Sequence, residues 1–168
     1  MRTAASGGNL ARRRKNSWSA APPPKCLFCL LVHPWEDSVP NIAEEIVRLT
    51  QQLLDAIDQR NWETYVELCD PTLTAFEPEA RGHLVEGLPF HAFYLKDATV
   101  ASDEQRQSSI SSPHVRVMGE VAVVSYVRLS QYRKGSQDST NHAEETRVWQ
   151  RQEGQWRHVH FHRSQPGS

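Results

Sequence analysis

The sequence has no long apolar run, few cysteines and no excess of charge of either sign. Its longest uninterrupted apolar stretch, Cys26–Val32, falls far short of the roughly 18 residues that cross a membrane. Three cysteines, an odd number, disfavour a disulfide framework and indicate a reducing compartment. The 19 basic side chains are matched by 20 acidic ones, which disfavours a nucleic-acid binder held by charge alone. We therefore expect a cytoplasmic protein whose partners include no membrane and no nucleic acid.

Charge and composition divide the chain into parts. The first 35 residues carry six basic side chains and no acid, whereas the remainder carries 13 basic and 20 acidic ones. The first 40 residues also contain Gly7-Gly8 and five prolines, and they show no sustained periodicity. These contrasts predict a disordered basic arm over residues 1–40, one folded domain over residues 41–164 and a short tail over residues 165–168.

Several interpretations of the arm remain open. Arg14-x-x-Ser17 is typical of a basophilic kinase site, and the basic stretch ending at Trp18 is typical of segments that contact calmodulin or a membrane surface. The lack of acids also fits a mitochondrial transit peptide or a nuclear address. A solvated basic linker explains the same composition without any of these roles.

Two histidine and cysteine patterns bear on metal binding. Cys26-x-x-Cys29 with His33 is half of a zinc site, and no second pair follows at a suitable spacing. His158, His160 and His162 alternate, which on a strand predicts one shared polar face. We therefore expect no metal site and no cofactor.

Helical signals begin abruptly at Asn41, which follows Pro40 and has Glu44 three residues later, as in a capping box. Apolar residues then recur at helical spacing, which predicts one amphipathic helix of about 19 residues. They are Ile42, Ile46, Leu49, Leu53 and Ile57. Asn61 is positioned to cap a second helix that ends at Asp70-Pro71, and Pro89 to open a third.

The period changes to two in the second half of the chain. A short strand is expected over residues 72–76, and an antiparallel meander over strands near 115–117, 121–132, 143–151 and 156–163. A loop is expected between residues 134 and 138. Helices followed by a meander predict an α+β fold in which the long helix lies across a curved antiparallel sheet and leaves a pocket.

Three arginines fall on strand faces that otherwise carry large apolar groups. Arg128 shares its face with Tyr126, Arg147 with Trp149, and Arg163 with Phe161. Buried guanidinium groups cost several kcal/mol each unless they are paired. The candidate internal partners are Glu77, Glu79, Glu144 and Glu145. If these do not suffice, the pocket is expected to bind a small carboxylate, which arginines grip in bidentate fashion.

A series of motifs occurs in order along residues 41–164. The motifs are Cys69-Asp70-Pro71, Thr74–Ala80, Leu84–Gly87, Phe90–Tyr94, Arg128–Tyr132, Glu144–Trp149 and His160–Ser164. Together they resemble the association (hub) domain of calcium/calmodulin-dependent protein kinase II. The resemblance implies a nuclear-transport-factor-2-like cone. It also implies self-assembly into two stacked rings of six or seven subunits, about 12–14 in all, that hold kinase domains around the rim.

The resemblance also implies a set of pocket residues. Arg128, Arg147 and Arg163 match the arginines that line the family's pocket, His91 matches a histidine at its mouth, and Tyr65 and Glu77 match further lining positions. Two stretches depart from the pattern. Arg81 stands where the family usually has leucine, and Ala98–Gln107 diverges.

The 168 residues contain no kinase motif: no glycine-rich phosphate loop, no His-Arg-Asp and no Asp-Phe-Gly. We therefore predict a non-catalytic oligomerisation hub that assembles with itself and co-assembles with kinase subunits bearing the same domain. The alternatives are a small-carboxylate-binding protein and an isomerase- or dehydratase-like enzyme of the same fold.

Overall fold

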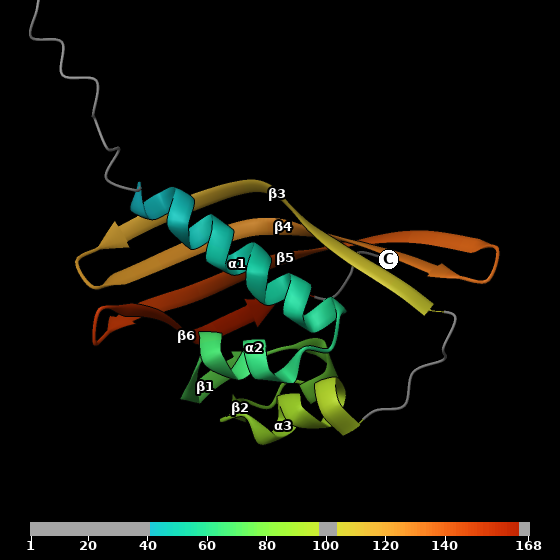
Figure 1. Ribbon diagram of the computed structural model, residues 1–168, viewed down its shortest axis with the longest axis horizontal. Coiled ribbons are helices and arrows are strands. Elements are labelled where there is room, and N and C mark those ends of the chain that lie inside the picture. The colour runs from blue at the N-terminus through green and yellow to red at the C-terminus, as the bar shows by residue number, and fades with distance from the viewer. Residues whose placement is uncertain (1–40, 98–103, 165–168) are drawn as a thin grey trace, which may run out of the picture. The chain divides into compact units, whose positions relative to one another are not determined.

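The computed structural model describes residues 41–97 and 104–164 (Figure 1). The predictions for the arm at 1–40 and the tail at 165–168, and the half zinc site at Cys26, Cys29 and His33, lie outside the described residues.

The first helix, α1, covers Ile42–Asp58 and begins as predicted. The Asn41 side chain accepts a hydrogen bond from the backbone N–H of Ala43 at 3.1 Å, and Glu44 and Glu45 lie in the first turn. The helix ends slightly earlier than expected because Arg60 adopts a left-handed backbone with φ 57°, which reverses the chain.

The second helix, α2, covers Trp62–Leu68 and is capped by Asn61, whose side chain accepts from the Thr64 backbone N–H at 3.1 Å. Strand β1, Cys69–Phe76, follows at once and includes Asp70-Pro71, so it begins three residues earlier than predicted. After the two-residue strand β2, Val85–Glu86, the helix expected at Pro89 is the short α3, Pro89–Ala92, continued by a π-helical turn at Phe93–Asp97.

One six-stranded sheet has the order β2-β1-β6-β5-β4-β3. The strands of its meander are β3 (Glu104–Met118), β4 (Val121–Lys134), β5 (Gln137–Gln152) and β6 (Gln155–Arg163). They exceed the predicted lengths. The loop expected between residues 134 and 138 is a tight turn at Gly135, since β4 and β5 pair as far as Lys134 and Gln137.

The expectation of a wholly antiparallel sheet was wrong for one pairing. β1 and β6 are parallel, with Ala75 opposite Phe161, whereas the other described pairs are antiparallel. Parallel neighbours require a long crossover between them, and here most of the domain forms that crossover. Turn residues between consecutive strands predict antiparallel hairpins. They give no information about a parallel pairing between strands far apart in the sequence.

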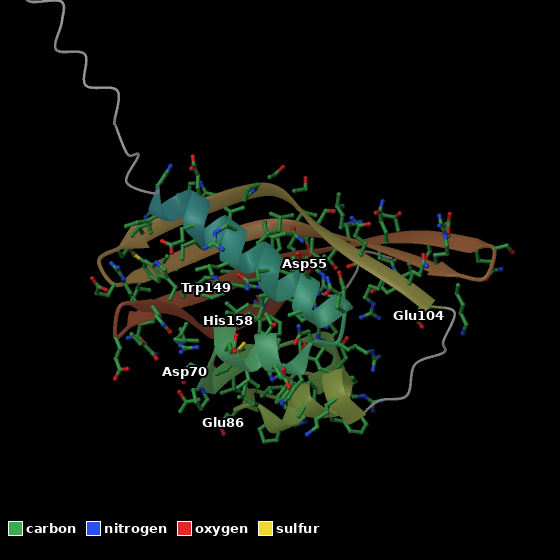
Figure 2. All side chains as sticks on the ribbon, viewed as in Figure 1. Asp55, Asp70, Glu86, Glu104, Trp149 and His158 are labelled. Carbon is green, nitrogen blue, oxygen red and sulfur yellow. The ribbon has the colours of Figure 1, made fainter. Side chains whose placement is uncertain are left out.

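A β-bulge divides the three alternating histidines. Trp149 pairs with His158, but the adjacent Val148 pairs with His160, so Val159 is an extra residue in β6. His158 therefore faces the core, where its ring lies 5.3 Å from that of Trp149 (Figure 2). His160 and His162 face the other way, with their rings 6.3 and 6.2 Å from that of Phe76. The prediction that all three share one face was wrong.

The core lies between α1 and the inner face of the sheet (Figure 1). Leu53 and Leu54 of α1 are completely buried and belong to the same cluster as Val124 and Trp149. The Trp149 indole donates to the Thr50 hydroxyl at 3.2 Å, and Thr50 donates to the Ile46 carbonyl at 2.7 Å, so both buried polar groups are satisfied. Among the described helices, none has the length and hydropathy needed to cross a membrane.

Candidate functional site

A cavity of about 340 Å³ lies beside the carboxyl end of α1, and its wall includes Glu104, where β3 begins (Figure 2). The six residues that the sequence singled out all line it: Tyr65, Glu77, His91, Arg128, Arg147 and Arg163. They come from α2, the end of β1, α3, β4, β5 and β6, so the fold gathers them from most of the chain. Whether they bind a ligand remains a prediction.

Arg147 is buried, with 1% of its surface exposed, and each of its nitrogens has a partner. Nη2 donates to Glu145 at 2.8 Å, Nε to the Tyr126 hydroxyl at 2.8 Å, and Nη1 to His158 Nε2 at 3.3 Å. The guanidinium also lies 4.6 Å from the centre of the Phe161 ring. Because a guanidinium only donates, His158 Nε2 must accept, which places the histidine proton on Nδ1.

Arg128 shares the carboxylate of Glu145 and adds a partner that the sequence analysis missed. Its guanidinium lies 3.5 Å from Glu145 Oε1 and 3.2 Å from Asp58 Oδ1, and its Nε donates to the Ser108 hydroxyl at 2.9 Å. Asp58 follows Leu54 by four residues and so continues the buried stripe of α1. The sequence feature that could have identified Asp58 as a partner is its position as a charged residue within this apolar stripe.

Arg163 lies nearer the surface, with 20% of its side chain exposed. It is 3.4 Å from Glu77 Oε2 and forms a close ion pair with Glu79. Glu144, the remaining predicted partner, is not in the cluster: it is exposed and hydrogen-bonds Ser164. Alternation along β5 places Glu144 on the opposite face from Glu145.

The electrostatic environment of Glu145, Arg147 and Arg128 keeps all three side chains ionised. Burial alone would raise the pKa of Glu145, but the charges of Arg147 and Arg128 outweigh it and lower that pKa to about 2. Five arginines and four carboxylates line the cavity, and Glu145 behind them supplies a fifth carboxylate. The carboxylates therefore equal the arginines in number, and ion pairs are formed by Arg106, Arg128, Arg147 and Arg163.

Side chains suited to nucleophilic or acid–base chemistry include the Glu77–His91 pair in the cavity wall and Cys69, which lies outside that wall. Burial raises the pKa of the Cys69 thiol to about 12, so the thiol remains protonated, and its sulfur lies 3.7 Å from His158 Nδ1. His91 Nε2 lies 3.4 Å from Glu77 Oε1, and within the described part of the chain neither atom has a hydrogen-bond partner. No cluster of three or more histidine, cysteine or acidic side chains among residues 41–97 and 104–164 has metal-binding geometry.

Comparison with known proteins identifies the family. The family model for the calcium/calmodulin dependent protein kinase II association domain matches residues 42–167. The chain belongs to this association-domain family. The family match supports an oligomerisation role for the chain.

Two relatives of the association domain extend the match to sequence and structure. The delta subunit of calcium/calmodulin-dependent protein kinase type II from Oryctolagus cuniculus is 50% identical over 123 residues, which are 72% of this chain and 23% of the kinase subunit. The hub homology domain from Chlamydomonas reinhardtii is 48% identical with a TM-score of 0.68, covering 73% of this chain and 96% of that one. The chain thus spans less than a quarter of the length of the kinase subunit.

A more distant structure identifies the fold. A nuclear transport factor 2-like superfamily protein from Salmonella enterica has a TM-score of 0.60 at 23% identity, over 76% of this chain and 92% of that one. The association domain therefore has the nuclear-transport-factor-2-like α+β fold predicted from its sequence.

Proposed function

We propose that this chain is a non-catalytic hub whose copies close into two stacked rings of about 12–14 subunits. The observation that carries the proposal is the extent of the family match, which runs from the first residue of α1 beyond the end of β6 and so includes every described element.

The buried polar groups of the domain support the non-catalytic part of the proposal. Arg128, Arg147 and Glu145 are held in mutual ion pairs, and the Cys69 thiol is protonated at neutral pH. An isomerase or dehydratase of this fold would need a base with a tuned pKa that reaches its substrate. The Glu77–His91 pair is a candidate for that role.

Sedimentation velocity tests assembly. At micromolar concentration the chain is expected to sediment as a single species of more than about 200 kDa, because about 12 or more chains of 19.2 kDa form each closed assembly. A folded species of one or two chains would overturn the proposal.

Co-assembly with kinase subunits is the finer part of the proposal. The 50% identity to the kinase delta subunit across the association domain supports compatible contacts. Mixing the chain with a tagged association domain from that subunit is expected to give hubs that contain both on affinity capture. The two proteins are dissociated and allowed to re-form assemblies together. Capture of the tagged domain without this chain would then contradict co-assembly.

Binding of a small carboxylate in the cavity is a second candidate function. Arg163 is partly exposed and is paired with the partly exposed Glu79, so an incoming carboxylate can replace that partner without disturbing the buried ion pairs. Acetate, butyrate and succinate, each compared with chloride at equal ionic strength, are expected to raise the melting temperature by mass action.

Arg163→Met is expected to abolish that response because it removes the guanidinium but keeps most of the bulk. Arg133→Met is the matched control, since Arg133 pairs with Asp138 on the surface, outside the cavity, at 2.8 Å. Equal shifts in all three proteins, or none in any, would mean that the arginines serve internal ion pairs only.

A further inference from the structure

The hairpin that joins β4 to β5 carries a motif that the proposed function does not use. Lys134 pairs with Gln137, so Gly135 and Ser136 form a two-residue turn. Gly135 has φ 60°, and a glycine with positive φ at the first position is typical of type II′ hairpin turns. Arg133 precedes Ser136 by three residues, so the turn carries the sequence Arg-Lys-Gly-Ser. Basophilic protein kinases select their substrates by such a charge pattern, with arginine three residues before the modified serine.

The tip of this hairpin has the exposure that a kinase substrate needs. Residues 133–142 are all exposed, and Figure 1 shows the orange hairpin reaching past the end of α1. Arg133 lies 2.8 Å from Asp138, and 60% and 65% of the two side chains are exposed. An exposed pair of this kind contributes little stability, so it does not prevent Arg133 from entering the acidic site of a kinase. Because the tip buries no core residue, it can open locally while the domain stays folded.

A second stretch with the same spacing shows what the turn adds. Residues 106–109, Arg-Gln-Ser-Ser, place Ser109 three residues after an arginine, but Ser109 lies within β3 and pairs with Leu129 of β4. Its neighbours hold the strand in place, since Ser108 is buried and Ile110 packs against the core. Presenting Ser109 to a kinase would require part of β3 to leave the core. Presenting Ser136 requires only the exposed tip of a hairpin to open.

We propose that Ser136 is a phosphorylation site for a basophilic serine kinase that uses ATP. Ser136 Oγ forms the new bond to the γ-phosphorus, and its proton passes to the carboxylate base of the kinase. The bond between the γ-phosphorus and the bridging oxygen breaks, and ADP leaves. This site goes beyond the proposed hub function and does not depend on it.

Modification would reverse the charge of the hairpin tip. Arg133 and Lys134 together outnumber Asp138 before modification, so the tip is basic. A phosphoserine adds about −1.5 to −2 charges at pH 7, which makes the same tip acidic. The tip would then attract basic partners and repel acidic ones, the opposite of its behaviour before modification.

A kinase assay on the full chain tests the site. Every protein carries Ser17→Ala, which removes the motif Arg14-x-x-Ser17 outside the described residues. The chain is incubated with magnesium, ATP and the catalytic subunit of cyclic-AMP-dependent protein kinase, and tandem mass spectrometry locates the phosphate. Most chains are expected to carry phosphate on Ser136 and few or none on Ser109.

Two arginine variants show whether the motif directs the kinase. Arg133→Gln is expected to slow modification of Ser136 about tenfold or more, because the kinase loses the guanidinium that it binds. Arg116→Gln is the matched control, since Arg116 is also an exposed strand arginine but lies outside the motif, and it is expected to leave the rate unchanged.

Three results would overturn the proposal. The first is no phosphate on Ser136 when the kinase modifies its standard peptide under the same conditions. The second is equal modification of Ser109 and Ser136, because the kinase would then be acting on unfolded chains. The third is an equal rate in Arg133→Gln and Arg116→Gln, because the motif would then not direct the kinase. The mass of the assembly is measured separately, so failure of this site leaves the proposed hub function intact.

Discussion

Glu145 occupies the centre of the buried charge cluster and explains how two guanidinium groups remain in the core. Its two oxygens contact Arg147 at 2.8 Å and Arg128 at 3.5 Å, and Asp58 gives Arg128 a second carboxylate. Removing one partner of a buried ion pair costs about 3–5 kcal/mol because the other charge is left uncompensated. The cluster is therefore a fixed part of the domain, whereas Arg163 at its edge is more exposed and pairs with Glu77 and Glu79.

His158 makes the stability of the domain depend on pH. Burial, and then the charge of Arg147, lower the pKa of His158 well below its usual 6.5. Below about pH 6.5 the His158 imidazole binds a proton in the unfolded chain but stays neutral in the folded chain. The contribution of this group therefore lowers the free energy of unfolding by up to about 1.4 kcal/mol for each pH unit of acidification.

His158→Gln is expected to reduce this acid sensitivity because glutamine does not titrate and can still accept from Arg147. Urea unfolding at pH 7.5 and pH 5.5, at one protein concentration, measures the change in the free energy of unfolding between the two pH values. The wild type is expected to lose more free energy of unfolding than the variant between the two values. Equal losses would show that His158 does not contribute.

At the scale of elements, local sequence signals predict the helices in full and the sheet only in part. Asn41 and Asn61 cap the helices that the sequence predicted, because capping depends on residues next to one another. The parallel pairing of β1 with β6 and the bulge at Val159 depend on residues far apart in sequence. For the same reason the sequence predicts the three arginines of the cavity but not Asp58, whose partner Arg128 is 70 residues away.

The cap of α2 can be tested by substitution. Asn61→Ala removes the acceptor of the Thr64 backbone N–H and is expected to lower the free energy of unfolding by about 1 kcal/mol. Asn61→Asp keeps an acceptor and adds favourable charge at the helix start, so it is expected to match the wild type. Denaturant unfolding followed by tryptophan fluorescence compares the three. Equal destabilisation by alanine and aspartate would contradict the capping role.

At the scale of the whole molecule, the two faces of the sheet are covered differently. Its inner face is closed by α1 and α2 and encloses the charged cavity, whereas its outer face is covered by no described element and carries charged side chains, such as Glu144 opposite Val127, among apolar ones.

Native mass spectrometry of the full chain tests the proposed assembly most directly, because it counts subunits of 19.2 kDa one by one. The account predicts a narrow set of masses at about 12 to 14 subunits, unchanged on dilution through the micromolar range, as expected of closed rings. A folded monomer or dimer, or a ladder of masses that shifts continuously with concentration, would contradict it.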